Sequence, residues 1–167
     1  MKNTNLAILI VLSLLAILCL VFYLLKNPLD SENNFIPEEY LTVKVFFNNS
    51  QMDPEASCNK VFPVERRIVK TLAVGRASLQ ELLKGPTEKE KAQGYFTSIN
   101  SGVKINSLTV EDGTAKVDFN EELEFQVGGS CRVSAIRAEI AQTLSQFPTV
   151  KEVIISINGR TEDILQP

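Results

Sequence analysis

The chain of 167 residues contains no histidine and no tryptophan. Without histidine, a Ser-His-Asp or Cys-His catalytic group, a histidine metal ligand and a histidine pH switch are all excluded. Aromatic residues make up 7% of the chain, so large stacking platforms for bases or sugars are not expected. The net charge of −3 argues against nucleic acid as a partner, because such proteins usually carry a basic face.

The three cysteines include no C-x-x-C pair, which argues against a thiol redox enzyme. The sequence also lacks the residue spacing of a calcium loop. From this inventory we expect no catalytic residue, no cofactor and no bound metal ion.

The longest apolar run extends from Leu6 to Leu25 and contains neither a charged residue nor a proline. A helix of about twenty residues spans about 30 Å, which is the thickness of the hydrocarbon core of a bilayer. We therefore predict that residues 1–26 form a single-pass transmembrane signal anchor, and that the protein lies in the cell membrane.

A cleaved signal peptide and a lipoprotein are the alternatives to a retained anchor. A cleaved signal has a shorter apolar region followed by a small-x-small site, whereas Leu24–Pro28 contains no such site. A lipid-modified cysteine would be Cys19, but Leu18 stands before it where a small residue is usual. The sequence therefore favours the retained anchor.

The short amino-terminal tail with Lys2 favours an amino terminus inside the cell and a domain on the extracytoplasmic side. Residues 27–40 contain two prolines, adjacent asparagines and several acidic residues, which predicts a linker. Residues 41–167 are long enough for one domain with its own core.

Alternating and helical spacings of apolar residues predict the elements of this domain. The predicted strands cover residues 41–48, 60–69, 103–110, 114–119 and 151–157, and the predicted helices cover 76–84, 87–93 and 131–146. Pro63 pushes the second strand to a sheet edge or a bulge, because proline donates no ladder hydrogen bond.

Local signals support several of the boundaries between these elements. Gly85 and Pro86 end the first helix, and Thr87 with Glu90 fits a capping box for the next one. The pair Asp112-Gly113 predicts a hairpin between two strands, and Ser130 is the predicted N-cap of the last helix.

The order of elements predicts an α+β fold, with the two main helices on one face of a single mixed sheet. Apart from the short second helix, the elements follow one another along the chain in the order β-β-α-β-β-α-β. A turn at Asn158-Gly159 follows the last strand, and residues 163–165 are expected to pair back onto the domain.

Cys58 and Cys131 form the sharpest candidate pair, because two cysteines in one domain outside the membrane suggest a disulfide. Closing a loop of about 74 residues stabilises a fold by about 4 kcal/mol at most in the chain-entropy model. The alternative is a pair of buried thiols packed as small apolar residues. We favour the disulfide.

Arg66, Arg67 and Lys70 form a basic stretch on the second strand, and are a possible interaction surface for acidic lipid headgroups or an acidic partner. The alternative is that these charges protect an edge strand from pairing with other chains.

Two further groups of residues suggest ligand sites only weakly. Asp118, Glu121, Glu122 and Glu124 could form a cation site or a pair of catalytic carboxylates, but a solvated loop is the favoured interpretation. Gly128–Ser130 could bind an anion at a helix start, but a flexible connection is favoured.

Two segments of the chain are the most specific for a known family, namely Leu-Leu-Lys-Gly-Pro-Thr at 82–87 and Thr-Leu-Ser-Gln-Phe-Pro-Thr-Val at 143–150. With them the chain resembles the GerMN domain, which occurs in sporulation and germination proteins of the GerM type. Residues 61–66, 102–105, 112–113 and 117–119 also match, and the resemblance covers about Leu41 to Gly159.

The resemblance implies an α+β fold similar to the ring-building motifs of secretion-type assemblies. It also implies a role in envelope assembly, sporulation or germination in bacteria, without a defined reaction. We therefore expect a membrane-anchored, non-enzymatic interaction domain whose partners are the membrane and other envelope proteins or itself. A module that binds the cell wall or a polysaccharide is the alternative.

Overall fold

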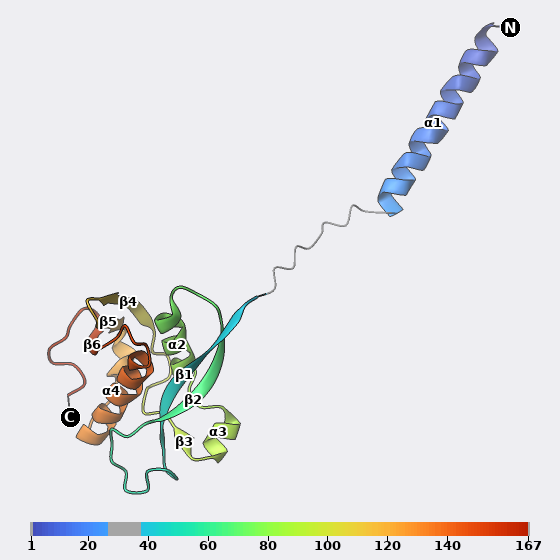
Figure 1. Ribbon diagram of the computed structural model, residues 1–167. Coiled ribbons are helices and arrows are strands. Elements are labelled where there is room, and N and C mark those ends of the chain that lie inside the picture. The colour runs from blue at the N-terminus through green and yellow to red at the C-terminus, as the bar shows by residue number, and fades with distance from the viewer. Residues whose placement is uncertain (1, 27–37, 167) are drawn as a thin grey trace. The chain divides into compact units, whose positions relative to one another are not determined.

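The computed structural model of the chain describes residues 2–26 and 38–166 (Figure 1). The chain divides into two compact units, Met1–Pro37 and Glu38–Pro167, and each is considered by itself. Most of the predicted linker, residues 27–37, lies outside the described residues.

Helix α1 of the first unit covers Lys2–Lys26 and so includes the whole apolar run. Over the residues that the structure describes, no helix combines the length and the hydropathy needed to cross a membrane. The transmembrane anchor stays a prediction from the sequence.

The second unit contains all the strands and helices that the sequence predicts for it, with bounds that differ by a residue or two. It also contains a two-residue strand and a 3-10 turn that the sequence does not predict. In chain order the elements are β1 (Tyr40–Asn49), β2 (Phe62–Val69), α2 (Val74–Leu83), α3 (Glu88–Ala92), β3 (Tyr95–Phe96), β4 (Ile105–Glu111), β5 (Thr114–Phe119), η1 (Glu121–Leu123), α4 (Ser130–Ser145) and β6 (Glu152–Ile157).

The strands form two separate three-stranded sheets, with the orders β2-β1-β3 and β4-β5-β6. In the first sheet β1 pairs antiparallel with β2. The short strand β3 pairs antiparallel with the last residues of β1, where Asn48 lies opposite Phe96. Pro63 lies on β2, which is an edge strand as predicted. In the second sheet β4 and β5 form an antiparallel hairpin, while β6 runs parallel to β5.

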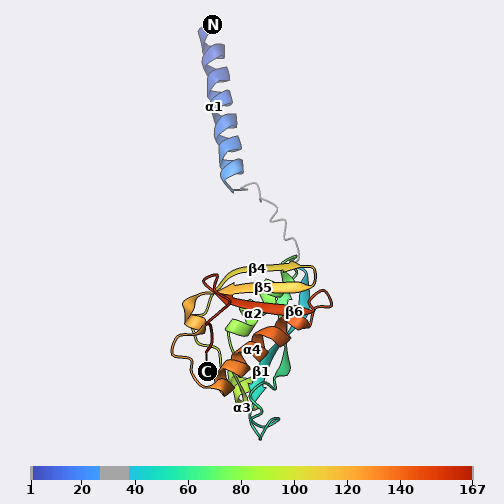
Figure 2. The same cartoon turned by 90° about the vertical axis from the view of Figure 1, so that its left-hand side faces the viewer.

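Helices α2 and α4 pack against each other and lie between the two sheets (Figures 1 and 2). Both contact β1, and α2 also contacts β4 while α4 contacts β6. The prediction of one sheet with helices on one face is therefore wrong. A helix between two sheets must bury two sides, and α4 buries Ala135 and Glu139 in addition to the predicted apolar stripe.

One apolar cluster links the two sheets and the helices between them. Phe47 of β1, Leu79 of α2, Phe119 of β5, Ile136 of α4 and Ile157 of β6 are all fully shielded from solvent. Each such side chain contributes about 1.5–3 kcal/mol on burial, so this cluster is the main stabilising feature of the domain.

Several turns have the geometry that their residues predict. Asp112 and Gly113 have φ angles of 49° and 86°, as a tight hairpin turn requires. Thr87 and Glu90 form both hydrogen bonds of the capping box at the start of α3. Gly85, with a φ of 74°, follows the end of α2.

Two details of the last third of the chain differ from the expectation. The N-cap of α4 is Gly129 rather than Ser130, and no side chain caps this end. The tail after β6 packs back through buried Ile164 and Leu165, with the Arg137 guanidinium donating to the Ile164 carbonyl. Among the described residues it forms no strand there.

Candidate functional site

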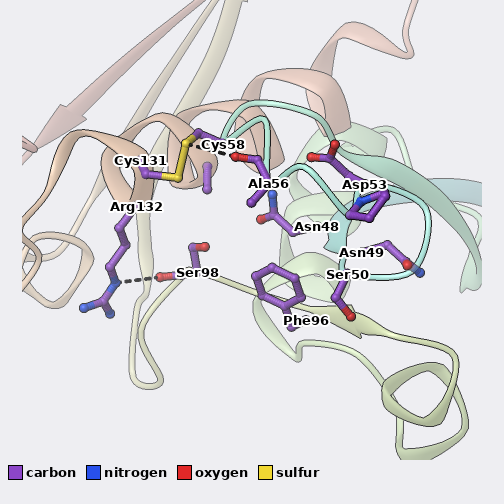
Figure 3. A pocket seen from close by; sticks show the side chains of 12 residues that line it. Asn48, Asn49, Ser50, Asp53, Ala56, Cys58, Phe96, Ser98, Cys131 and Arg132 are labelled. Atoms are coloured by element: carbon purple, nitrogen blue, oxygen red, sulfur yellow. Dashed lines mark hydrogen bonds between the residues drawn. A yellow bond between two sulfur atoms is a disulfide. The ribbon is translucent and has the colours of Figure 1, made fainter.

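A groove of about 420 Å³ lies where the end of β1, strand β3 and the first turns of α4 meet (Figure 3). Its walls are largely apolar, and the Cys58–Cys131 disulfide forms one side. The lining residues are Asn48, Asn49, Ser50, Asp53, Pro54, Ala56, Cys58, Phe96, Ser98, Cys131, Arg132 and Ala135.

The register of β1 and β3 sets two of these side chains next to each other. Asn48 and Phe96 are directly paired across the two strands, so their side chains lie on the same face of the sheet. Phe96 is 47% exposed and presents its ring at the rim of the groove. An aromatic side chain exposed beside a cavity offers an apolar contact to a ligand.

Asn48 carries the unusual polar atom of the site. The side chain is only 6% exposed, and its Nδ2 donates to the Lys60 carbonyl at 3.3 Å. Its Oδ1 is buried and has no hydrogen-bond partner among the residues that the structure describes. A buried acceptor without a donor is costly, by about 1–3 kcal/mol, so it calls for an explanation.

The disulfide joins the β1–β2 loop to the start of α4. Cys58 lies in that loop and Cys131 in the first turn of the helix, with their Cα atoms 4.8 Å apart. This is the pairing that the sequence favours. The loop is further held by Asp53, whose carboxylate accepts from the Ser57 N–H and hydroxyl. These bonds from Ser57 lower the pKa of Asp53.

Glu139 of α4 holds the opposite side of the groove from inside the core. The side chain is 0% exposed, and its carboxylate accepts from the Thr97 hydroxyl at 2.5 Å and from the Ser98 N–H at 2.8 Å. Burial raises the pKa of Glu139 to about 7, although both hydrogen bonds oppose that shift. The segment after β3 is thereby tied to the helix.

Arg132, about two turns before Glu139 on α4, ties down the same segment. Its guanidinium donates to the Ser98 carbonyl at 3.4 Å and to Asn100 Oδ1 at 2.6 Å (Figure 3 shows the first bond). It also donates to the Gln126 carbonyl at 3.2 Å. The arginine therefore uses its hydrogen-bond donors to fix one wall of the groove.

Few charged side chains at the groove are free to take part in a reaction. Arg132 and Asp53 are engaged in internal hydrogen bonds, and Glu139 is sealed in the core. The groove walls are largely apolar, with uncharged polar residues such as Ser98 among them, and Asn48 Oδ1 is buried behind them without a hydrogen-bond partner among the described residues. Such a surface suits the binding of an uncharged, largely apolar group.

Arg66 and Arg67 of β2, and Lys70 directly after that strand, have separate partners. Arg66 forms a two-pronged ion pair with Glu90 at 2.6 and 2.7 Å, and this pair lowers the pKa of Glu90. The Arg67 guanidinium stacks 4.2 Å from the centre of the Tyr40 ring. Lys70 pairs with Glu39 at 2.8 Å. Whether these residues contact a partner stays a prediction.

The acidic residues after β5 stabilise neighbouring turns. The Asp118 carboxylate accepts from Asn106, Ser156 and the Gly159 N–H. Partial burial raises the pKa of Asp118, but these bonds outweigh it and the net pKa is lowered. Glu124 pairs with Arg160. Within residues 2–26 and 38–166, no cluster of three or more possible ligand side chains could hold a metal ion.

Gly128–Ser130 connects η1 to α4, and Gly129 adopts a φ of 86° there. The structure places no side-chain cap at this helix end. Whether this helix start binds an anion stays a prediction.

Sequence reasoning missed Asn48, Phe96 and Arg132, which line the groove, and Glu139, which is buried behind it. For Glu139 a signal was present, because it stands between Ile136 and Ile140 on the buried side of a helix. A carboxylate at such a position requires buried donors. For Asn48 and Phe96 no local signal exists, since only the β1–β3 pairing brings them together.

Comparison with known proteins agrees with this architecture. The chain is 32% identical over 89 residues to the spore germination protein GerM of Bacillus subtilis (strain 168). That match covers 52% of this chain and 24% of GerM, so the chain spans about a quarter of its relative's length.

Two solved structures share the fold. The first GerMN domain of the sporulation protein GerM from Bacillus subtilis superposes with a TM-score of 0.56 at 19% identity, covering 72% of this chain and 85% of that one. The tandem GerMN domains of the same protein give a TM-score of 0.54 at 26% identity, and the match covers 80% of this chain and 43% of that one. The family profile named Germane, described as sporulation and spore germination, matches residues 44–163. The chain therefore belongs to the Germane family, with a GerM-like domain, as its sequence motifs indicated.

Proposed function

We propose that this protein is a non-enzymatic interaction domain, anchored in the cell membrane, that assists the assembly of a bacterial envelope complex on the extracytoplasmic side. The observation that carries the proposal is the groove beside the disulfide. Its charged neighbours are engaged in holding its walls, and a largely apolar surface remains for a partner. Membership of a family described by sporulation and spore germination supports a role in those processes.

The apolar run of Leu6–Leu25 supports the anchor in this proposal. A tethered domain meets other membrane proteins at a high effective concentration, so weak contacts suffice for assembly. The Cys58–Cys131 disulfide supports the extracytoplasmic side, because disulfides persist in oxidising compartments.

Site-specific photo-crosslinking in the native membrane tests this function. A photo-reactive amino acid replaces Phe96 at the groove rim in one variant of the full chain, and Phe125, which is 58% exposed and lies outside the groove, in a control. We expect the groove variant to capture a defined envelope protein or a second copy, and the control to capture much less. Capture of nothing by either variant, in cells where the protein is expressed, contradicts the proposal.

A cell-wall or polysaccharide-binding module is the second candidate, and the half-exposed ring of Phe96 is the observation that favours it. Sugar rings pack on exposed aromatic faces. A pull-down of the full chain on purified wall material tests it, with Phe96→Ala and Phe125→Ala as matched variants. This candidate predicts retention of the wild type and of the Phe125 variant, and loss of the Phe96 variant.

A further inference from the structure

Leu72 is the most exposed apolar side chain that the structure describes in the domain, and it lies in the loop between β2 and α2. Its exposed fraction is 106%, so the side chain is fully accessible to solvent. The Ala73 N–H donates to the Thr71 hydroxyl oxygen at 3.1 Å, which fixes the turn on both sides of Leu72. A single exposed leucine is common on a protein surface, so its neighbours decide what it means.

Three other exposed side chains join Leu72 in one patch. Val110 of β4, 47% exposed, lines the same hollow of about 330 Å³ as Leu72. Val69 and Tyr40, which are also exposed, lie directly opposite each other on β2 and β1. They line a second hollow, which shares Ala73 with the first. An exposed cluster of this kind, here called the Leu72 patch (Tyr40, Val69, Leu72 and Val110), is typical of an interaction surface.

The charged side chains beside Tyr40 compensate one another. Lys70 pairs with Glu39 at 2.8 Å, and the Arg67 guanidinium stacks on the Tyr40 ring. The Tyr40 hydroxyl donates to the Glu38 carboxylate at 2.7 Å. Two acidic and two basic residues thus stand at this edge, so the apolar side chains of the patch, rather than a net charge, determine what it binds. Tyrosine is a residue that membrane proteins place at the level of the lipid headgroups.

The position of the patch along the chain identifies the surface that covers it. Tyr40 is the first residue of β1, the strand with which the domain begins. The chain before it leads back to Leu6–Leu25, the run that the proposed function places in the membrane. At about 3.3 Å per residue, the segment from Lys26 to Tyr40 reaches about 46 Å at most. A bilayer is therefore always within reach of the Leu72 patch, and at the effective concentration of a tether a weak contact suffices.

We propose that the Leu72 patch docks on the surface of the bilayer in which the protein is anchored, with Leu72 inserted at the boundary between headgroups and acyl chains. The Tyr40 ring lies at the level of the headgroups in this arrangement. Because Phe96 pairs with Asn48 near the other end of β1, docking leaves the groove facing away from the bilayer, where a partner can reach it. This inference rests on the proposed membrane anchor and adds the lipid surface as a second contact of the domain.

Tryptophan fluorescence tests the docking, because the chain contains no tryptophan of its own. The full chain with Leu72→Trp is reconstituted into phosphatidylcholine vesicles with normal or brominated acyl chains, since the bromine atoms quench a tryptophan that enters the bilayer. Phe96→Trp, at a position 47% exposed near the other end of β1, is the matched control. We expect brominated lipid to quench the Leu72→Trp variant at least about threefold more strongly than the control, and its emission to lie at shorter wavelength.

A second pair of variants separates docking by the native side chain from affinity that the introduced tryptophan adds. Val110→Trp reports from the edge of the patch, and Leu72→Asp is then introduced into the same chain. We expect Leu72→Asp to reduce the quenching of Val110→Trp at least about threefold, because an aspartate at the boundary must give up its hydration. Since Leu72 is fully accessible, the melting temperature should stay unchanged.

Equal, weak quenching of Leu72→Trp and Phe96→Trp overturns the docking, as does quenching that requires added phosphatidylglycerol. A shift to shorter wavelength that grows with the ratio of protein to lipid, without quenching by bromine, would mean that a second copy covers Leu72, and also overturns it. If photo-crosslinking still captures an envelope protein in these cases, the interaction function stands. Release of the chain from the vesicles by alkaline carbonate would instead overturn the anchor, and this inference with it.

Discussion

At the scale of single residues, Glu139 is the buried side chain that joins α4 to the segment beside the groove. It lies in the interior between Ile136 and Ile140, where a charge is expensive. Donors from Thr97 and Ser98 offset part of that cost, and the raised pKa shows that they do not offset all of it. The result is a fixed connection between α4 and the segment that carries Phe96.

This burial makes the stability of the domain depend on pH. The pKa of Glu139 is about 7 in the folded chain, against an ordinary value of 4.5. Below pH 4.5 the group is protonated in both states. Between pH 4.5 and 7 the unfolded chain loses this proton while the folded chain keeps it, so the free energy of unfolding should fall by about 3 kcal/mol as the pH rises, and level off above pH 7.

Glu139→Gln should remove this slope, because the amide stays neutral and can still accept from Ser98 and donate to the Thr97 hydroxyl. Urea unfolding between pH 4.5 and 8 measures the difference between the two proteins. The pKa values of Asp118 and Glu90 are lowered in the folded chain, so these two groups increase the free energy of unfolding as the pH rises through the lower range. Both proteins contain these groups, so their contribution cancels in the difference. Parallel curves for wild type and variant would show that Glu139 is not the responsible group.

At the scale of elements, the disulfide joins a loop without regular structure to the start of α4. Cys58 has a φ of 63°, a backbone conformation that glycine favours, so the loop depends on its anchoring for this geometry. The bond thus fixes one wall of the groove as well as closing a long stretch of chain.

Replacing both cysteines by alanine should lower the free energy of unfolding by up to about 4 kcal/mol, the loop-closure value for this separation. Unfolding of the double variant and of the wild type, with and without reductant, measures the loss. The same alkylated mass with and without prior reduction, in a Cys19→Ala background, would mean that the bond does not form.

The capping box of α3 should contribute on a smaller scale. Thr87→Ala removes the acceptor for the Glu90 N–H, and we expect a loss of about 1 kcal/mol. Thr161→Ala, at an exposed position in the tail, is the matched control and should leave the denaturation midpoint unchanged. An equal midpoint for Thr87→Ala would show that the Arg66–Glu90 ion pair alone holds this helix.

At the scale of the molecule, the core cluster is made entirely of residues between Val45 and Leu165. A chain shortened to residues 38–167 should therefore unfold cooperatively at the same temperature as the full chain. Calorimetry of the two proteins, the full chain in micelles, provides the comparison. A shortened chain without a thermal transition would mean that the first unit is needed for folding.

Most of the elements could be predicted from the sequence, because their signals are local. The alternation in β1 and β5, the pair Asp112-Gly113 and the capping box at Thr87 each depend on residues within a few positions. The sheet topology could not be predicted, because strand patterns do not say which strands pair. A helix such as α4, whose polar Glu139 and Thr143 are buried, also hides its second packing face from a hydrophobicity pattern.

The sequence by itself determined the secondary structure, the candidate Cys58–Cys131 pairing and membership of the family, since these depend on short-range spacing and on motifs. Only the tertiary structure decided that two sheets enclose the helices and that Asn48 stands beside Phe96 with an unpaired oxygen. The reason is that a groove is made by contacts between distant segments. Hydrogen-bond satisfaction is likewise a property of the packed chain alone.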